Sequence, residues 1–72
     1  MSNTLSSEEF SIRAAAVLGG RGWMLRLSQS IGVHYATVKR WASGDLTVPE
    51  YAVSVIELLE VVPAAMRPKR FL

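Results

Sequence analysis

The chain has 72 residues, of which half are hydrophobic, and its net charge at pH 7 is +2. This length allows one small domain, and the hydrophobic content excludes an intrinsically disordered chain. With no cysteine and one histidine, the sequence excludes disulfides and a thiolate zinc site, and we expect no metal and no cofactor.

The first helix signal comes at Ser6, which stands three residues before Glu9. This is the spacing of a capping box, in which each side chain bonds the backbone N–H of the other residue. Apolar residues at helical spacing continue through residues 7–18, and Gly19 then favours a helix end. We expect residues 1–5 to be a flexible segment that precedes this helix.

Two short helices follow, over residues 24–31 and 35–43. Gly32 separates them and Gly44 ends the second one. Glycine favours both positions because the residue after a helix commonly takes a positive φ.

A fourth helix is predicted over residues 49–62, because Pro49 suits a first helical turn and Pro63 cannot continue the helix. No segment alternates apolar and polar residues as a strand would. The expected fold is therefore all-α, with four to five helices. We place the domain at 6–63 and a basic C-terminal tail at 64–72, which either makes a short fifth helical turn, packs on a partner or stays disordered.

Charge is distributed unevenly along the chain. Residues 10–44 contain five arginine or lysine side chains and no carboxylate, whereas residues 45–60 contain four carboxylates. A basic segment without acids is typical of a surface that faces a polyanion. Small helical domains also acquire unequal charge by chance. The charge pattern alone therefore gives equal weight to a surface that binds nucleic acid and to a chance distribution.

The two helices around Gly32 have the features of a helix-turn-helix. Ser28 is a small residue that allows close crossing, and Gly32 permits the turn. Apolar residues would anchor the second helix and leave its opposite face free: Leu27, Ile31, Val33, Val38 and Trp41. A helix held in this way can enter the major groove of DNA.

The segment from Gly22 to Glu50, GWMLRLSQSIGVHYATVKRWASGDLTVPE, resembles the Cro and lambda-repressor-like helix-turn-helix family, also called the xenobiotic-response-element type. The residues that match or nearly match the family pattern are Leu27, Ser28, Ile31, Gly32, Val33, Thr37, Val38, Trp41, Gly44 and Pro49. This resemblance covers most of the chain. It implies a lambda-repressor-like fold with a central helix-turn-helix that binds double-stranded DNA.

The resemblance places four residues where family members face base edges: Tyr35, Ala36, Lys39 and Arg40. A second set is expected to contact DNA phosphates: Arg21, Trp23, Arg26, His34, Thr37, Ser43, Gly44 and Leu46. Arginine can bond guanine bidentately, so Arg40 is the favoured base reader, with a phosphate contact or a solvated charge as alternatives. Trp23 either packs in the core or lies against the DNA backbone. His34 stands where the family usually has a serine or threonine helix cap.

These residues predict a sequence-specific transcriptional regulator, with repression as the expected outcome. A homodimer on a palindrome is expected because one such domain buries little surface on DNA. One alternative is an antitoxin-type autorepressor whose tail binds a toxin. Another is a helix-turn-helix used only for protein–protein interaction, with a protein partner at the fourth helix or the tail.

Other classes of protein fit the sequence poorly. No serine, aspartate or cysteine pattern accompanies the single histidine, so we expect no enzymatic activity. The N-terminus is polar and acidic, unlike a signal peptide, and no apolar run is long enough to cross a bilayer. We therefore expect a bacterial or phage protein of the cytoplasm, associated with the nucleoid, without a membrane partner.

Overall fold

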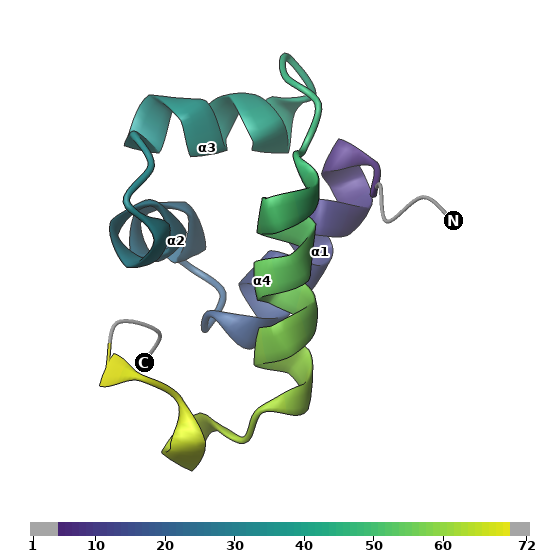
Figure 1. Cartoon of the computed structure of the whole chain (residues 1–72). Coiled ribbons are helices and arrows are strands. Elements are labelled where there is room, and N and C mark those ends of the chain that lie inside the picture. Colours follow the sequence, from purple (N-terminus) through teal and green to yellow (C-terminus); the bar gives the residue numbers. More distant parts are fainter. Residues whose placement is uncertain (1–4, 70–72) are drawn as a thin grey trace.

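The computed structural model describes residues 5–69, which form four α-helices and one short 3-10 helix (Figure 1). They are α1 (Ser7–Val17), α2 (Trp23–Ile31), α3 (Tyr35–Ser43), α4 (Glu50–Val61) and η1 (Ala64–Met66). The all-α prediction is confirmed, and each predicted helix end lies within one residue of the observed end. The prediction of a flexible N-terminal segment falls almost wholly on residues 1–4, which lie outside the described residues, as do residues 70–72 of the tail.

The ends of α1 illustrate how local signals set the helix limits. The Ser6 Oγ accepts a hydrogen bond from the Glu9 N–H at 3.1 Å, and the Glu9 side chain bonds the Ser6 N–H in return. At the other end, Gly19 has φ +87° and the Gly20 N–H donates to the Ala15 carbonyl at 2.6 Å. This bond closes the helix in the pattern that a left-handed residue permits.

The four α-helices pack around one core, and α1 contacts each of the other three. In Figure 1, α3 crosses near the amino-terminal end of α4, and α2 is viewed along its axis. Three residues join α2 to α3. This connection places α3 at one end of the molecule, with α2 packed beside it.

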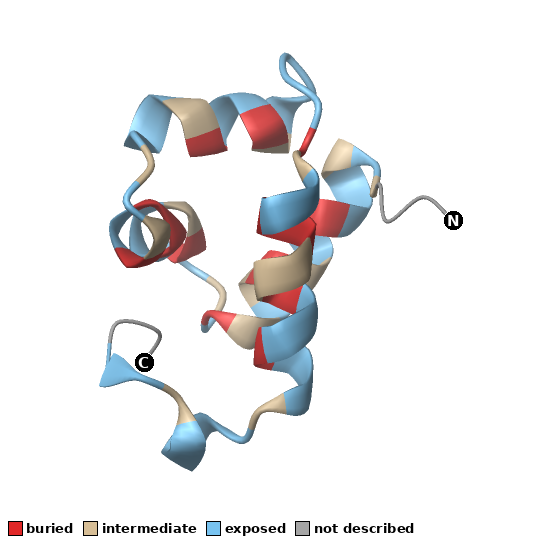
Figure 2. Cartoon of the chain, in the orientation of Figure 1, coloured by how far each residue is buried: buried red, intermediate tan, exposed pale blue. Residues whose placement is uncertain are grey.

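Phe10 lies at the centre of the core, between two tryptophan rings. Its ring centroid is 5.8 Å from that of Trp23 and 6.1 Å from that of Trp41, and both pairs meet edge to face. Figure 2 shows that the buried residues of each helix face its neighbours. The buried apolar residues are Phe10, Ala14, Leu18, Trp23, Leu27, Val38, Trp41, Val48, Ala52, Val53, Ile56 and Leu59.

Arg67 attaches the segment after α4 to the helical domain. Its Nη1 donates to the Val17 carbonyl at 2.8 Å and its Nη2 to the Leu59 carbonyl at 2.9 Å, while its Nε lies 3.4 Å from the Val62 carbonyl. These oxygens belong to the carboxyl ends of α1 and α4, where carbonyls lack partners inside the helix. One guanidinium therefore caps two helices and positions residues 64–69 against them.

A salt bridge joins the exposed sides of α1 and α4. The Arg13 Nε donates to Glu60 Oε2 at 2.8 Å, and the Arg13 Nη2 bonds the other carboxylate oxygen. These hydrogen bonds, together with the arginine charge, hold the pKa of Glu60 below its ordinary value. Arg13 therefore links α1 to α4, although it is one of the basic residues of the segment 10–44.

Candidate nucleic-acid interface

The turn between α2 and α3 depends on Gly32, which has φ +72°. The Val33 N–H donates to the Ser28 carbonyl at 3.0 Å and closes α2. A Cβ at position 32 would meet no atom within 4 Å, so the positive φ, and not lack of space, favours glycine here. Ser28 is buried, and its Oγ donates to the Leu25 carbonyl at 2.7 Å, within its own helix.

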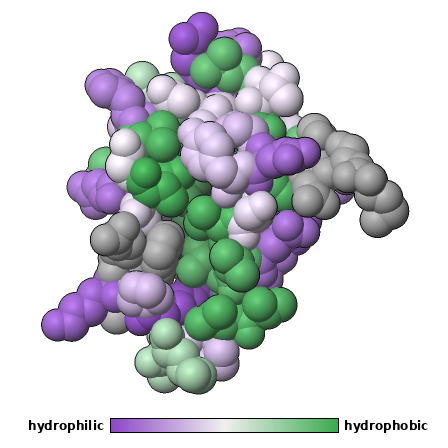
Figure 3. All heavy atoms as spheres, in the orientation of Figure 1, coloured by the Kyte–Doolittle hydropathy of each residue, from purple (hydrophilic) through white to green (hydrophobic). Residues whose placement is uncertain are grey.

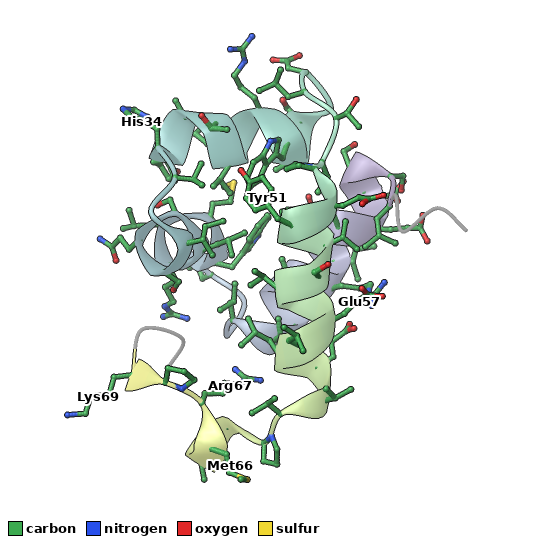
Figure 4. The ribbon with its side chains drawn as sticks, viewed as in Figure 1. His34, Tyr51, Glu57, Met66, Arg67 and Lys69 are labelled. Carbon is green, nitrogen blue, oxygen red and sulfur yellow. The ribbon has the colours of Figure 1, made fainter. Side chains whose placement is uncertain are left out.

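His34 is the N-cap of α3. Its Nδ1 accepts a hydrogen bond from the Ala36 N–H at 3.2 Å, and its carbonyl accepts one from the Thr37 N–H at 2.9 Å. Because Nδ1 accepts this hydrogen bond, the donor of the capping ring is its Nε2–H. Figure 4 shows the imidazole at the exposed start of α3, where this N–H donor faces away from the domain.

One face of α3 is anchored in the core. Val38 is fully buried and Trp41 is nearly so, as the helical spacing predicts. The residues with predicted contacts to base edges all lie on the exposed face: Tyr35, Ala36, Lys39 and Arg40. Thr37 is half-buried between the two faces. The arrangement is a short helix with one side fixed and the other open.

The exposed face of α3 is cationic with one carboxylate at its end. Lys39 Nζ lies 5.7 Å from the centroid of the Tyr35 ring, which orients the ammonium along the helix. Arg40 has no hydrogen bond or salt bridge through its side chain among the described residues. A shallow groove on this face is lined by Ala36, Lys39, Arg40, Ser43 and Asp45. Asp45 belongs to the acidic segment 45–60, yet it lines the same groove as Arg40.

The loop after α3 contains Gly44 and Leu46, two of the residues predicted to contact phosphates. Gly44 has φ +90° and reverses the chain. The Leu46 N–H donates to the Arg40 carbonyl at 3.1 Å, and the Asp45 N–H to Ser43 Oγ at 3.4 Å. The Leu46 amide is therefore engaged inside the protein and is not free for a phosphate.

Two of the five basic side chains in residues 10–44 have partners inside the fold. Arg13 pairs with a carboxylate of α4, and the Arg26 Nη1 donates to the Leu18 carbonyl at the end of α1. The rest are exposed and have no hydrogen bond or salt bridge to the described residues: Arg21, Lys39 and Arg40. The basic charge open to a polyanion is thus smaller than the sequence count and lies mainly on α3.

Trp23 lies in the core and not on the surface. Only 9% of the residue is exposed, and its ring packs on Phe10. Of the two interpretations that the sequence left open, core packing is the one observed. Little of Trp23 remains to contact a DNA backbone.

Other kinds of site are not found within residues 5–69. This part of the chain has no cluster of histidine, aspartate and glutamate that could hold a metal ion. None of its helices combines the length and hydrophobicity required to cross a bilayer.

Comparisons with protein-family models, with curated proteins and with solved structures return no match.

Proposed function

We propose that this chain binds double-stranded DNA in a sequence-specific manner and represses transcription, with a lambda-repressor-like arrangement of its helices. The observation that carries the proposal is the exposed face of α3, where Lys39 and Arg40 have no salt-bridge partner among the described residues. A nine-residue helix is about 14 Å long and about 10–12 Å wide with its side chains. The major groove of B-DNA, about 12 Å wide, accepts a helix of this size.

The side chains of α3 suit different parts of a DNA site. Arg40 would bond the O6 and N7 of a guanine, because its guanidinium is planar and lacks an internal partner. Lys39 would contact a phosphate, since the Tyr35 ring holds its ammonium close to the helix. Ala36 is small enough to let a base pair approach and can contact a thymine methyl.

The start of each helix offers further contacts to the DNA backbone. Gly22 precedes α2 without a side-chain cap, so the positive end of this helix is open to a phosphate. Arg21 is exposed next to it. The Nε2–H of His34 would donate to a phosphate near the start of α3 while Nδ1 keeps the cap.

The test is a fluorescence-anisotropy titration of a preferred duplex and a scrambled duplex at several salt concentrations. Arg40→Ala is expected to lose about 1–3 kcal/mol of binding free energy on the preferred duplex and much less on the scrambled one. Lys39→Ala is expected to weaken binding to both duplexes alike. It should also reduce the salt slope, which is the slope of log K for binding against log salt concentration, by about one.

The matched control is Arg13→Gln, which removes one positive charge from the salt bridge on α1 and α4, away from the exposed face of α3. Its salt slope on both duplexes should equal that of the parent. Absence of binding by the parent at micromolar protein and low salt would overturn the proposal and favour a protein-interaction module.

A further inference from the structure

Asp45 places a carboxylate on an otherwise cationic surface. It stands two residues after α3 and lines the groove that also contains Lys39 and Arg40. The other residues that line this groove, Ala36 and Ser43, are uncharged. Figure 3 shows hydrophilic side chains along the outer edge of α3 and its loop, whereas apolar side chains gather over α4. A carboxylate that faces DNA phosphates lowers the affinity for DNA, so its place in this groove calls for a physical reason.

Hydrogen bonds of the loop hold Asp45 next to the last turn of α3. The Arg40 carbonyl accepts one hydrogen bond from Ser43 Oγ at 3.2 Å and another from the Leu46 N–H at 3.1 Å. Ser43 Oγ in turn accepts one from the Asp45 N–H at 3.4 Å. Gly44, with φ +90°, provides the chain reversal that these bonds require. The backbone of Asp45 is therefore tied to that of Arg40 through the Ser43 hydroxyl.

Arg40 and Asp45 line one groove without forming a salt bridge to each other. Both side chains are exposed, and neither has a hydrogen bond or salt bridge to the part of the chain that the structure describes. Exposed ion pairs contribute little in water, because solvent screening and the loss of side-chain freedom offset their attraction. The two side chains therefore gain little by pairing until another contact fixes the guanidinium.

A guanine in the major groove of DNA would supply that contact. Bidentate bonding to O6 and N7 uses the N–H donors on one edge of the planar guanidinium. The donors on its other edges remain available to a carboxylate, which can accept parallel N–H···O bonds from an arginine. The ion pair would also be stronger there than in the free protein, because DNA displaces water from the groove.

We infer that Asp45 is a positioning residue for Arg40: its carboxylate accepts the remaining guanidinium N–H groups when Arg40 bonds a guanine. This inference rests on the proposed function, since it gives Asp45 a role only in the DNA complex. On a duplex without guanine at that position, Arg40 is not held in line and the carboxylate repels nearby phosphates. Asp45 therefore increases the preference for one sequence by aligning Arg40 and by weakening binding elsewhere.

A double-mutant cycle with Arg40→Ala and Asp45→Asn tests this role by titration of the preferred and the scrambled duplex. Asparagine keeps the size of the side chain and the backbone N–H that bonds Ser43, so the loop should be unchanged. Asp45→Asn is expected to weaken binding to the preferred duplex by roughly tenfold and to strengthen binding to the scrambled one about twofold. In the Arg40→Ala background, the same change should no longer weaken binding to the preferred duplex, because no guanidinium is left to position.

Glu57→Gln is the matched control, because it removes one carboxylate charge from the exposed surface of α4, away from α3 (Figure 4). Its preference between the two duplexes should equal that of the parent. If Asp45→Asn weakens binding to the preferred duplex equally with and without Arg40, Asp45 does not act through Arg40 and the inference is wrong. Stronger binding to both duplexes by one factor would indicate phosphate repulsion alone and would also overturn it.

The same titrations separate this inference from the proposed function. A parent that does not distinguish the two duplexes, or an Arg40→Ala variant that keeps the full preference, would contradict the proposed function. A preference that depends on Arg40 but not on Asp45 would contradict the positioning role alone.

Discussion

The three hydrogen bonds of Arg67 lead to a quantitative prediction that separates structural arginines from those open to DNA. Arg67→Met keeps much of the apolar stem but removes every donor to the carbonyls of Val17, Leu59 and Val62. Those oxygens then depend on water at the ends of α1 and α4. The variant should fold, but with lower stability.

The magnitude follows from the geometry. Hydrogen bonds to a charged group contribute about 1.5–3 kcal/mol each, but Arg67 is half-buried and one of its three bonds is long at 3.4 Å. Two of the three bonds are counted as effective, and their contribution is reduced because water reaches them. The expected loss in the free energy of unfolding is therefore about 2 kcal/mol. For a domain of this size that corresponds to a fall in Tm of roughly 8–16 °C.

Thermal and urea unfolding followed by circular dichroism measure this loss. Lys69→Ala is the control, because Lys69 is exposed and has no hydrogen bond or salt bridge to the described residues. Its Tm should equal that of the parent. Arg67→Met should also retain the salt slope of DNA binding. A Tm within about 2 °C of the parent, or a reduced salt slope, would refute the structural role of Arg67.

Three further changes test the turn, the cap and the salt bridge. His34→Ala removes the acceptor for the Ala36 N–H and should cost about 1 kcal/mol in urea unfolding, whereas His34→Asn should restore most of it. Gly32→Ala meets no clash, so its cost should be only the positive-φ penalty of about 1–2 kcal/mol; no cost in the same assay would contradict the observed turn. Hydrogen bonds from Arg13 lower the pKa of Glu60, so its stabilisation is complete above the ordinary carboxyl pKa and is lost as pH falls through the lower pKa of the folded state. Glu60→Gln should therefore reduce Tm at about pH 7, and its difference from the parent should shrink as the pH falls below the ordinary carboxyl pKa. A difference that stays constant with pH would exclude this linkage.

The helix limits could be predicted from sequence because their causes are local. The capping box at Ser6 and Glu9 and the positive-φ glycines act within a few residues, and the structure confirms them. The buried positions of α3 follow from helical spacing alone. Val38 and Trp41 lie three residues apart, on the same side of the helix, so a core face and an exposed face could both be assigned.

The contacts that the sequence did not reveal join distant segments. Arg67 bonds a carbonyl 50 residues away, and Arg13 pairs with a carboxylate 47 residues away. No spacing rule links such positions, because their distance depends on how the helices pack. A count of basic residues therefore overstated the basic charge that has no partner inside the fold.

The candidate site itself was predicted in part. The exposure of the outward residues of α3 could be predicted from the helical pattern. The conformation of the loop after α3 could not. Gly44 turns the chain so that the Leu46 amide is used internally and Asp45 lies beside Arg40. His34 takes the capping role of a serine through its ring nitrogen. Loop geometry and rotamers decide such details, and neither has a simple pattern in the sequence.

The most direct test of the central claim is selection of bound duplexes from a random pool, with the parent and with Arg40→Ala. We predict that the parent enriches one motif and that the variant loses its preference at one base pair of each half-site while keeping the others. Enrichment of the same full motif by both proteins, or of none by the parent, would contradict base reading by the exposed face of α3.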